Sequence, residues 1–257
     1  MRYVSWSQVE LFLKCERQYF YEYILGEKRP ETPILVIGKA YHTMIESYFT
    51  GVGIAKLVDD ESMEFLKAKT TIDIAGLQRE MRENLMRLKS QFLDGLGRPF
   101  IVEWKFEDEV LGYRGTIDAA MQRTPVMSPD GEEISTWLEE SCVVDWKSLT
   151  SERRRSQRDA VYSGQLALYA TVAGTRNAGF VEIPRNLGEP IKARFVRYTE
   201  EELNHWRSWL VGVRDAMLSR GEQMQAYHQT ERKNPLCSPQ WCGHFFKCYP
   251  AALGPEE

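Results

Sequence analysis

Two acidic segments contain the residues whose types and spacing are best suited to chemistry. GTIDAAM places Asp118 among mostly apolar residues, and VVDWKSL places Asp145 and Lys147 two positions apart. Side chains two apart on a strand point to the same face, so neighbouring strands would bring these three groups together. Two carboxylates with backbone carbonyls suit Mg²⁺ or Mn²⁺, which activates water and stabilises charge on a phosphate. The alternative interpretation is a surface ion pair between Asp145 and Lys147.

Three cysteines near the end of the chain indicate a second site. Cys237, Cys242 and Cys248 lie within the segment CSPQWCGHFFKC. Tetrahedral thiolate sites for zinc or for an iron–sulfur cluster take four ligands, so one ligand must come from elsewhere. His244 could complete a zinc site with the three cysteines. Cys142 lies in an apolar run and is interpreted as a core residue.

Two helices are expected near the start of the chain from the spacing of apolar residues. The first opens at Ser5, which has a capping-box pattern, and continues with Cys15 on its buried side. The second covers residues 38–49 and places His42 one turn from Glu46. An ion pair with Glu46 would be the structural explanation for His42.

The rest of the chain is expected to contain helices, then three strands, a helix, two strands and a last helix. Further helices are expected over residues 61–94, 159–173 and 199–218. Strands are expected over residues 100–110, 115–123, 141–149, 179–184 and 193–198.

Composition limits the class of protein. The chain has 257 residues, of which 43% are hydrophobic and 27% charged, as is typical of a folded globular protein. Five cysteines, an odd number, favour a reducing compartment in which thiols bind metal. No apolar run is long enough for a membrane span, and the first ten residues lack a signal-peptide pattern. The net charge of −4 means that nucleic-acid binding would need a local basic patch.

Five short segments occur in a fixed order: SWSQVELFLKCERQYFYEY, GKAYHTMIE, GTIDAAM, VVDWKSLT and GQLALYA. With the terminal cysteines, this order resembles the PD-(D/E)XK nuclease superfamily, and in particular its RecB-like branch that carries an iron–sulfur cluster. That branch includes the nuclease of the AddAB helicase–nuclease, the nucleases of CRISPR adaptation and phage exonucleases. The resemblance spans nearly the whole chain. It implies a restriction-endonuclease-like α/β core, with a central mixed sheet flanked by helices.

The resemblance assigns metal-site roles to individual residues. His42 is similar to the family's metal-associated histidine, and Asp118 to its first metal carboxylate. Asp145 and Lys147 are similar to its D-x-K pair, and the carbonyl of Trp146 is implied as a further metal ligand.

Three other parts of the chain also match the family. Gln165 and Tyr169 resemble its helical Q-x-x-x-Y motif, which is thought to help hold DNA or the catalytic lysine. Glu103 stands where the family often has an acidic residue on the preceding strand. The segment between Asp118 and Asp145 is longer than is typical and is expected to be an inserted hairpin.

The resemblance also implies a [4Fe-4S] cluster whose fourth ligand is Cys15, with Cys237, Cys242 and Cys248 as the other three. Taken by itself, Cys15 would be interpreted as a buried core cysteine. The cluster would join the two ends of one nuclease domain. Its expected parts are an N-terminal helical part at 1–95, a nuclease core at 100–220 and a cysteine segment at 230–250.

A basic run follows the D-x-K strand. It contains four arginines: Arg153, Arg154, Arg155 and Arg158. A charge run is usually a solvated face, but here it would stand beside the metal site. Contact with the phosphates of the DNA backbone is therefore expected.

We therefore expect a Mg²⁺- or Mn²⁺-dependent deoxyribonuclease, acting as an exonuclease on single-stranded DNA or on duplex ends. It would work in DNA processing, recombination or repair, in the cytoplasm of a bacterium or of a phage-infected host. One alternative is a CRISPR adaptation nuclease that acts with an integrase. Others are a catalytically silent DNA-binding scaffold subunit and a structural zinc protein.

Overall fold

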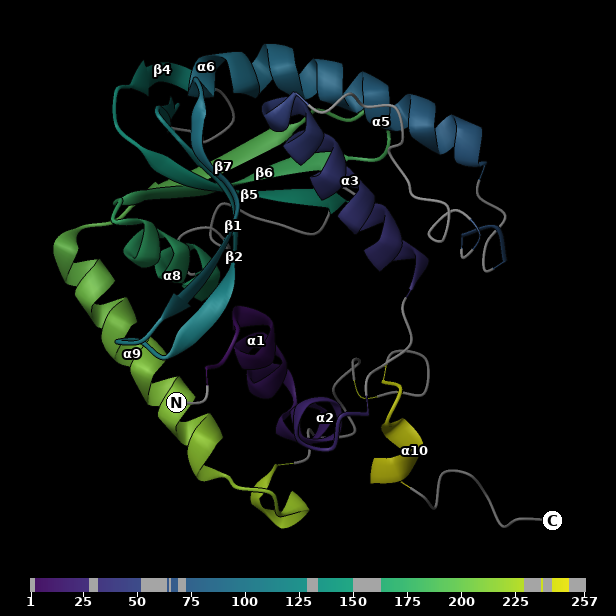
Figure 1. Ribbon diagram of the computed structural model, residues 1–257, viewed down its shortest axis with the longest axis vertical. Coiled ribbons are helices and arrows are strands. Elements are labelled where there is room, and N and C mark those ends of the chain that lie inside the picture. The colour runs from purple at the N-terminus through teal and green to yellow at the C-terminus, as the bar shows by residue number, and fades with distance from the viewer. Residues whose placement is uncertain are drawn as a thin grey trace. The chain divides into compact units, whose positions relative to one another are not determined.

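The computed structural model describes residues 3–27, 32–51, 64, 66–68, 73–128, 134–149, 163–228, 237 and 242–249 (Figure 1). The chain forms two compact units. The first, here called the terminal unit, comprises Met1–Pro30, Glu107–Gly115 and Ser208–Glu257. The second, here called the sheet unit, comprises Glu31–Phe106 and Thr116–Arg207. The organisation into a single nuclease domain stays a prediction.

A five-stranded mixed sheet is the centre of the sheet unit, in the order β1-β2-β5-β6-β7. The strands are β1 (Pro99–Asp108), β2 (Tyr113–Met121), β5 (Cys142–Leu149), β6 (Asn177–Pro184) and β7 (Lys192–Arg197). β2 and β5 pair antiparallel, β5 and β6 parallel, and β6 and β7 antiparallel. The strands expected from the sequence are all present, and the mixed central sheet is confirmed.

Helices cover both faces of this sheet (Figure 1). α3 (Pro33–Thr50) and α5 (Ile74–Leu88) cover one face, and α8 (Gly164–Ala173) covers the other. A π-helical turn (Lys89–Leu93) and the short α6 (Asp94–Leu96) extend α5. Because apolar side chains of α3, α5 and the sheet meet in one buried cluster, the core lies between these helices and the sheet.

Local signals account for the bounds of α3, the helix that carries His42. The hydroxyl of Thr32 accepts a hydrogen bond from the Leu35 N–H at 3.4 Å, and Pro33 occupies the first turn. Gly51 ends the helix with a left-handed φ of 72°.

The expected inserted hairpin is present as a separate two-stranded antiparallel sheet. It consists of β3 (Thr124–Met127) and β4 (Ile134–Leu138). The hairpin packs closely against α6, since a Cβ added at Gly95 would lie 2.1 Å from the Trp137 ring. A residue without a side chain is required at that contact.

The first helix differs from its expected form. Instead of one continuous helix, the terminal unit has α1 (Trp6–Lys14), α2 (Glu16–Tyr19) and a π-helical turn (Phe20–Ile24). Cys15 separates them in an extended conformation with φ −161° and ψ 103°. The expectation that Cys15 lies on the buried side of one helix was therefore wrong, and its side chain is half-buried.

Tertiary packing explains the break. After Cys15 the chain turns so that Phe20 and Tyr19 pack on Tyr227, with ring centroids 4.9 and 6.2 Å apart. The burial of these large rings outweighs the helical preference of the segment.

The remaining helices are α9 (Glu200–Ser219), the 3₁₀ turn Met224–Ala226 and α10 (Phe245–Cys248). As expected from the capping box, the Thr199 hydroxyl accepts from the Glu202 N–H at 3.1 Å. Among the helices described, none combines the length and apolar character needed to cross a bilayer.

Candidate active site

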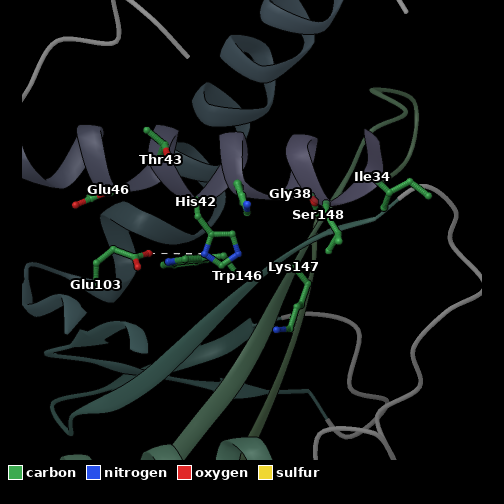
Figure 2. A pocket seen from close by; sticks show the side chains of 11 residues that line it. Ile34, Gly38, His42, Thr43, Glu46, Glu103, Trp146, Lys147 and Ser148 are labelled. Atoms are coloured by element: carbon green, nitrogen blue, oxygen red, sulfur yellow. Dashed lines mark ion pairs between the residues drawn. The ribbon is translucent and has the colours of Figure 1, made fainter. Parts of the chain in front are cut away.

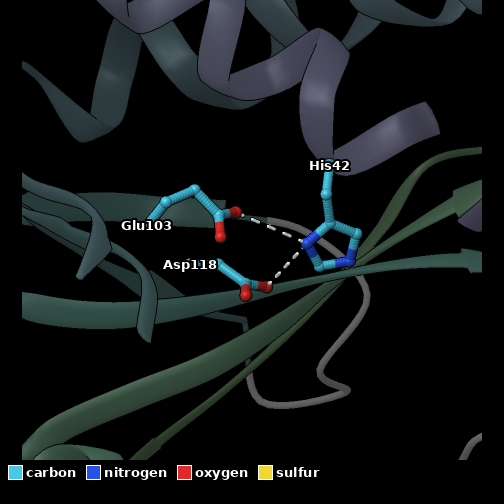
Figure 3. Close-up of side chains that lie close together, drawn as sticks. All are labelled: His42, Glu103 and Asp118. Carbon is cyan, nitrogen blue, oxygen red and sulfur yellow. Dashed lines mark ion pairs between the residues drawn. The ribbon is translucent and has the colours of Figure 1, made fainter. Parts of the chain in front are cut away.

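Three side chains from three different elements converge in the sheet unit (Figure 3). His42 comes from α3, Glu103 from β1 and Asp118 from β2. His42 Nδ1 lies 3.5 Å from Asp118 Oδ2 and 3.7 Å from Glu103 Oε1. One ligand atom from each of the three lies within 4.8 Å of the others. We call these three residues the triad.

A backbone contact fixes the position of Asp118. Its Oδ2 accepts a hydrogen bond from the Trp146 N–H at 2.9 Å, and only 7% of the residue is exposed. The pairing of Ala119 with Val144 sets this register between β2 and β5. Asp118 is therefore held beside the strand that carries the D-x-K pair.

Asp145 and Lys147 point to the same side of β5 and form an ion pair between Asp145 Oδ2 and Lys147 Nζ. Asp145 is 2% exposed, and the Lys147 ammonium also lies 5.7 Å from the centroid of the Phe180 ring. A surface ion pair is the wrong interpretation, because the carboxylate is buried.

The first turn of α8 supplies a hydrogen-bond donor to this carboxylate. Gln165 Nε2 donates to Asp145 Oδ1 at 3.0 Å and to the Tyr169 hydroxyl at 3.2 Å. Ser163 caps the helix by accepting from the Leu166 N–H at 3.3 Å. Both residues of the Q-x-x-x-Y motif thus lie beside Asp145.

The electrostatics of the site show an excess of negative charge. Burial opposes protonation of His42, but Asp118 and Glu103 outweigh it and raise the pKa of His42 to about 10. Burial raises the pKa of Asp145 to about 6; Lys147 opposes this shift and Asp118 adds to it. A divalent cation would offset the charge that these shifts reflect.

The donor set fits a divalent cation. An imidazole nitrogen and two carboxylates are available within one small volume, and carboxylate oxygens are the ligands that Mg²⁺ and Mn²⁺ prefer. Glu103 belongs to this set, whereas Asp145 contacts Lys147 and Gln165. The N–H of Trp146 donates a hydrogen bond to Asp118. Metal ligation by the backbone carbonyl of Trp146 stays a prediction.

Glu103 has an unusual backbone conformation for a residue in a strand. Its backbone is left-handed, with φ 45°, inside strand β1. Such a conformation is costly for a residue with a side chain and is concentrated at functional sites. The acidic residue itself was visible in the sequence, but its backbone conformation had no local signal.

A pocket of about 640 Å³ adjoins the triad (Figure 2). His42, Glu103 and Lys147 line it together with Trp146 and Ser148. Its remaining wall is formed by α3, with Ile34, Leu35, Gly38, Lys39, Thr43 and Glu46. Glu46 therefore lines the pocket, while His42 pairs with Glu103 and Asp118.

The cysteines of the predicted cluster all belong to the terminal unit. Burial raises the pKa of the Cys248 thiol to about 11, and Arg17 opposes this shift. The thiols of Cys15, Cys242 and Cys237 each add to it, so each lies within electrostatic range of that thiol. Ligation of one cluster by the four cysteines stays a prediction.

His244 is buried among other groups. Its Nε2 lies 3.9 Å from Glu22 and its Nδ1 3.8 Å from Glu27, and its ring stacks on Tyr21 at 4.9 Å. Both ring nitrogens thus lie within 4 Å of a carboxylate oxygen, and zinc ligation by His244 stays a prediction.

Cys142 is fully buried, and its Sγ donates to the Arg123 carbonyl at 3.1 Å, which confirms it as a core residue. The four arginines of the basic run lie outside the described residues.

The acidic residues of the triad thus lie on two neighbouring strands of a mixed sheet that is flanked by helices. The chain belongs to the PD-(D/E)XK nuclease superfamily, whose family model matches residues 3–248. None of the curated proteins matches it in sequence.

One solved structure agrees at the level of the fold. The crystal structure of a "Putative exonuclease" from Eubacterium rectale is 16% identical, with a TM-score of 0.56 over 91% of this chain and 86% of that chain. The crystal structure of SSO0001 is also 16% identical over 93% of this chain and 94% of that chain, but its TM-score of 0.35 carries no argument.

Proposed function

We propose that this nuclease is a Mg²⁺- or Mn²⁺-dependent deoxyribonuclease of the RecB-like branch, acting as an exonuclease. The observation that carries the proposal is the triad, whose ligand atoms lie within 4.8 Å of one another beside the ion pair of Asp145 and Lys147. The similarity in fold to a protein named an exonuclease supports the mode of action.

Each residue of the site has a task in phosphodiester hydrolysis. The triad would hold the cation, which lowers the pKa of a water molecule and stabilises charge on the phosphate. Lys147 presents its ammonium at the pocket, where it can orient the attacking water or neutralise developing charge. Gln165 holds one oxygen of Asp145, so that the other stays directed at Lys147.

Cleavage of end-labelled DNA tests this proposal. The purified protein is incubated with single-stranded and blunt duplex DNA, with Mg²⁺, Mn²⁺ or EDTA. Cleavage should depend on the cation and start at the ends, and Lys147→Ala should remove it. Lys89→Ala is the matched control, because Lys89 is a partly exposed lysine of the same unit whose partner is Asp94. Wild-type rates in Lys147→Ala would refute the assigned site.

For the terminal unit, we propose a [4Fe-4S] cluster held by Cys15, Cys237, Cys242 and Cys248. Their shared place in the terminal unit supports it, together with the resemblance of the sequence to the branch that carries such a cluster. Cysteine thiols stay reduced, and so available as ligands, under the reducing conditions of a cytoplasm. A zinc ion on the same cysteines is the alternative.

The other candidate functions have weaker support. A catalytically silent scaffold subunit would have no use for a buried aspartate paired with lysine and glutamine. Association with an integrase or with a recombination partner remains a prediction from the family resemblance. DNA contact by Arg153, Arg154, Arg155 and Arg158 also remains a prediction.

A further inference from the structure

The wall of the pocket formed by α3 has a composition that the hydrolytic site does not explain. This helix has one buried stripe, which comprises Val36, Ile37, Ala40, Tyr41, Met44 and Ile45. A second stripe, Leu35, Lys39, His42 and Glu46, follows steps of four, three and four residues and lines the pocket. His42 thus belongs to a continuous strip of side chains that extends beyond the triad.

The start of this strip is apolar and exposed. Leu35 of the strip and its neighbour Ile34 have exposed fractions of 57% and 55%, although both line the pocket. Figure 2 shows Ile34 at one end, Glu46 and Glu103 at the other, and His42 and Lys147 between them. Exposed apolar side chains in a pocket with a few convergent polar groups are typical of a ligand site.

The size of the pocket limits the ligand. A volume of about 640 Å³ falls in the range of sites that enclose one small molecule, roughly 300–1,000 Å³. In a duplex, the faces of the bases are covered by their stacked neighbours. An apolar wall can contact a base face only when that base is unstacked.

We propose that the first turns of α3 form a subsite for an unpaired nucleotide next to the scissile phosphate. Ile34 and Leu35 contact the face of its base, and Lys39 contacts its phosphate. The ligand's identity as nucleic acid rests on the proposed nuclease function. The subsite then defines the substrate as single-stranded DNA or a frayed end, without preference for sequence.

Binding to a cleavage-silent protein tests the subsite. In a Lys147→Ala background, fluorescence anisotropy measures the affinity for a labelled oligothymidylate and for one of equal length with abasic residues. The abasic strand should bind about tenfold more weakly, because the burial of a base face against the apolar wall is lost. The double variant Ile34→Ser, Leu35→Ser should bind oligothymidylate about tenfold more weakly and should no longer distinguish the two strands.

Met86→Ser is the control, since Met86 is an apolar residue of α5 with 66% exposure that does not line the pocket. It should leave both affinities unchanged. Thermal unfolding should show that the double variant is folded, because both changed residues are exposed. Equal affinities of the parent and the double variant for oligothymidylate would overturn the subsite, as would an equal loss for both strands.

The two proposals fail in different ways. If the wild-type protein cleaves DNA but the double variant binds normally, the subsite is wrong and the nuclease proposal stands. If no DNA is cleaved but discrimination against the abasic strand depends on Ile34 and Leu35, the subsite stands and the proposed activity is wrong.

Discussion

The carboxylate of Asp118 accepts a hydrogen bond from the backbone N–H of Trp146 at 2.9 Å. One oxygen thereby joins β2 to β5 and lies 3.5 Å from His42 Nδ1. The same side chain thus contacts His42 of the triad and the strand that carries Asp145 and Lys147.

Asp118→Asn and Asp118→Ala should separate the proposed metal binding by Asp118 from its hydrogen bond with Trp146. Both should lower cleavage by more than about a hundredfold, because a metal carboxylate is lost. Only the alanine variant leaves the Trp146 N–H without its acceptor, which costs about 1–3 kcal/mol. Urea unfolding without metal should therefore show Asp118→Ala as the less stable variant. Equal stabilities would mean that the hydrogen bond contributes little.

Glu103→Gly and Glu103→Ala should differ in stability when they are unfolded in urea without metal. A left-handed backbone costs about 1–2 kcal/mol for a residue with a side chain, and glycine avoids this cost. Glu103→Gly should therefore unfold at higher urea than Glu103→Ala. Both should need at least about tenfold more Mn²⁺ for the thermal stabilisation that a bound metal provides. An unchanged Mn²⁺ requirement would exclude Glu103 as a ligand.

Gln165→Leu should lower the single-turnover cleavage rate by about tenfold to a hundredfold. It removes a hydrogen bond to the buried carboxylate of Asp145, and hydrogen bonds to charged groups are worth about 1.5–3 kcal/mol. Tyr169→Phe is the control within the motif, since its hydroxyl bonds to Gln165 and not to Asp145. A larger loss in Tyr169→Phe would contradict the role of Gln165.

Cys15→Ala should remove the iron from protein purified without oxygen, whereas Cys142→Ala should keep it. Cys15 lies in the terminal unit with the other three cysteines, and Cys142 is buried in the sheet unit. Absorbance and iron analysis give the answer, with His244→Gln expected to retain iron. One bound zinc and no iron would refute the cluster, and iron loss only in Cys142→Ala would reverse the ligand assignment.

Reversal of Arg153, Arg154 and Arg155 to glutamate should weaken DNA binding with little dependence on sequence. If all three contact phosphates of a single strand, the slope of log affinity against log salt should become less steep by about two. Reversal of Arg79 and Arg82, exposed on α5, is the control. An unchanged slope in the first variant would place the basic run away from the substrate.

Much of the fold follows from local patterns in the sequence. Alternating and continuous apolar runs predicted β2, β5, β6 and β7, and a 3.6-residue period predicted the helix that carries His42. The carboxylates and the lysine could be found because residues two apart on a strand share a face. These features depend on neighbours within a few positions.

The tertiary structure decided the features that depend on contacts between distant residues. Glu103 lies beside His42 and Asp118 and has a left-handed backbone in the edge strand β1, and no local pattern encodes either feature. The helix predicted through Cys15 breaks because Phe20 and Tyr19 bury their rings against Tyr227, more than two hundred positions away. Sequence by itself thus determined most of the strands and helices and indicated which side chains are suited to chemistry. The packing of those elements determined which side chains meet, because burial and strain are properties of the assembled chain.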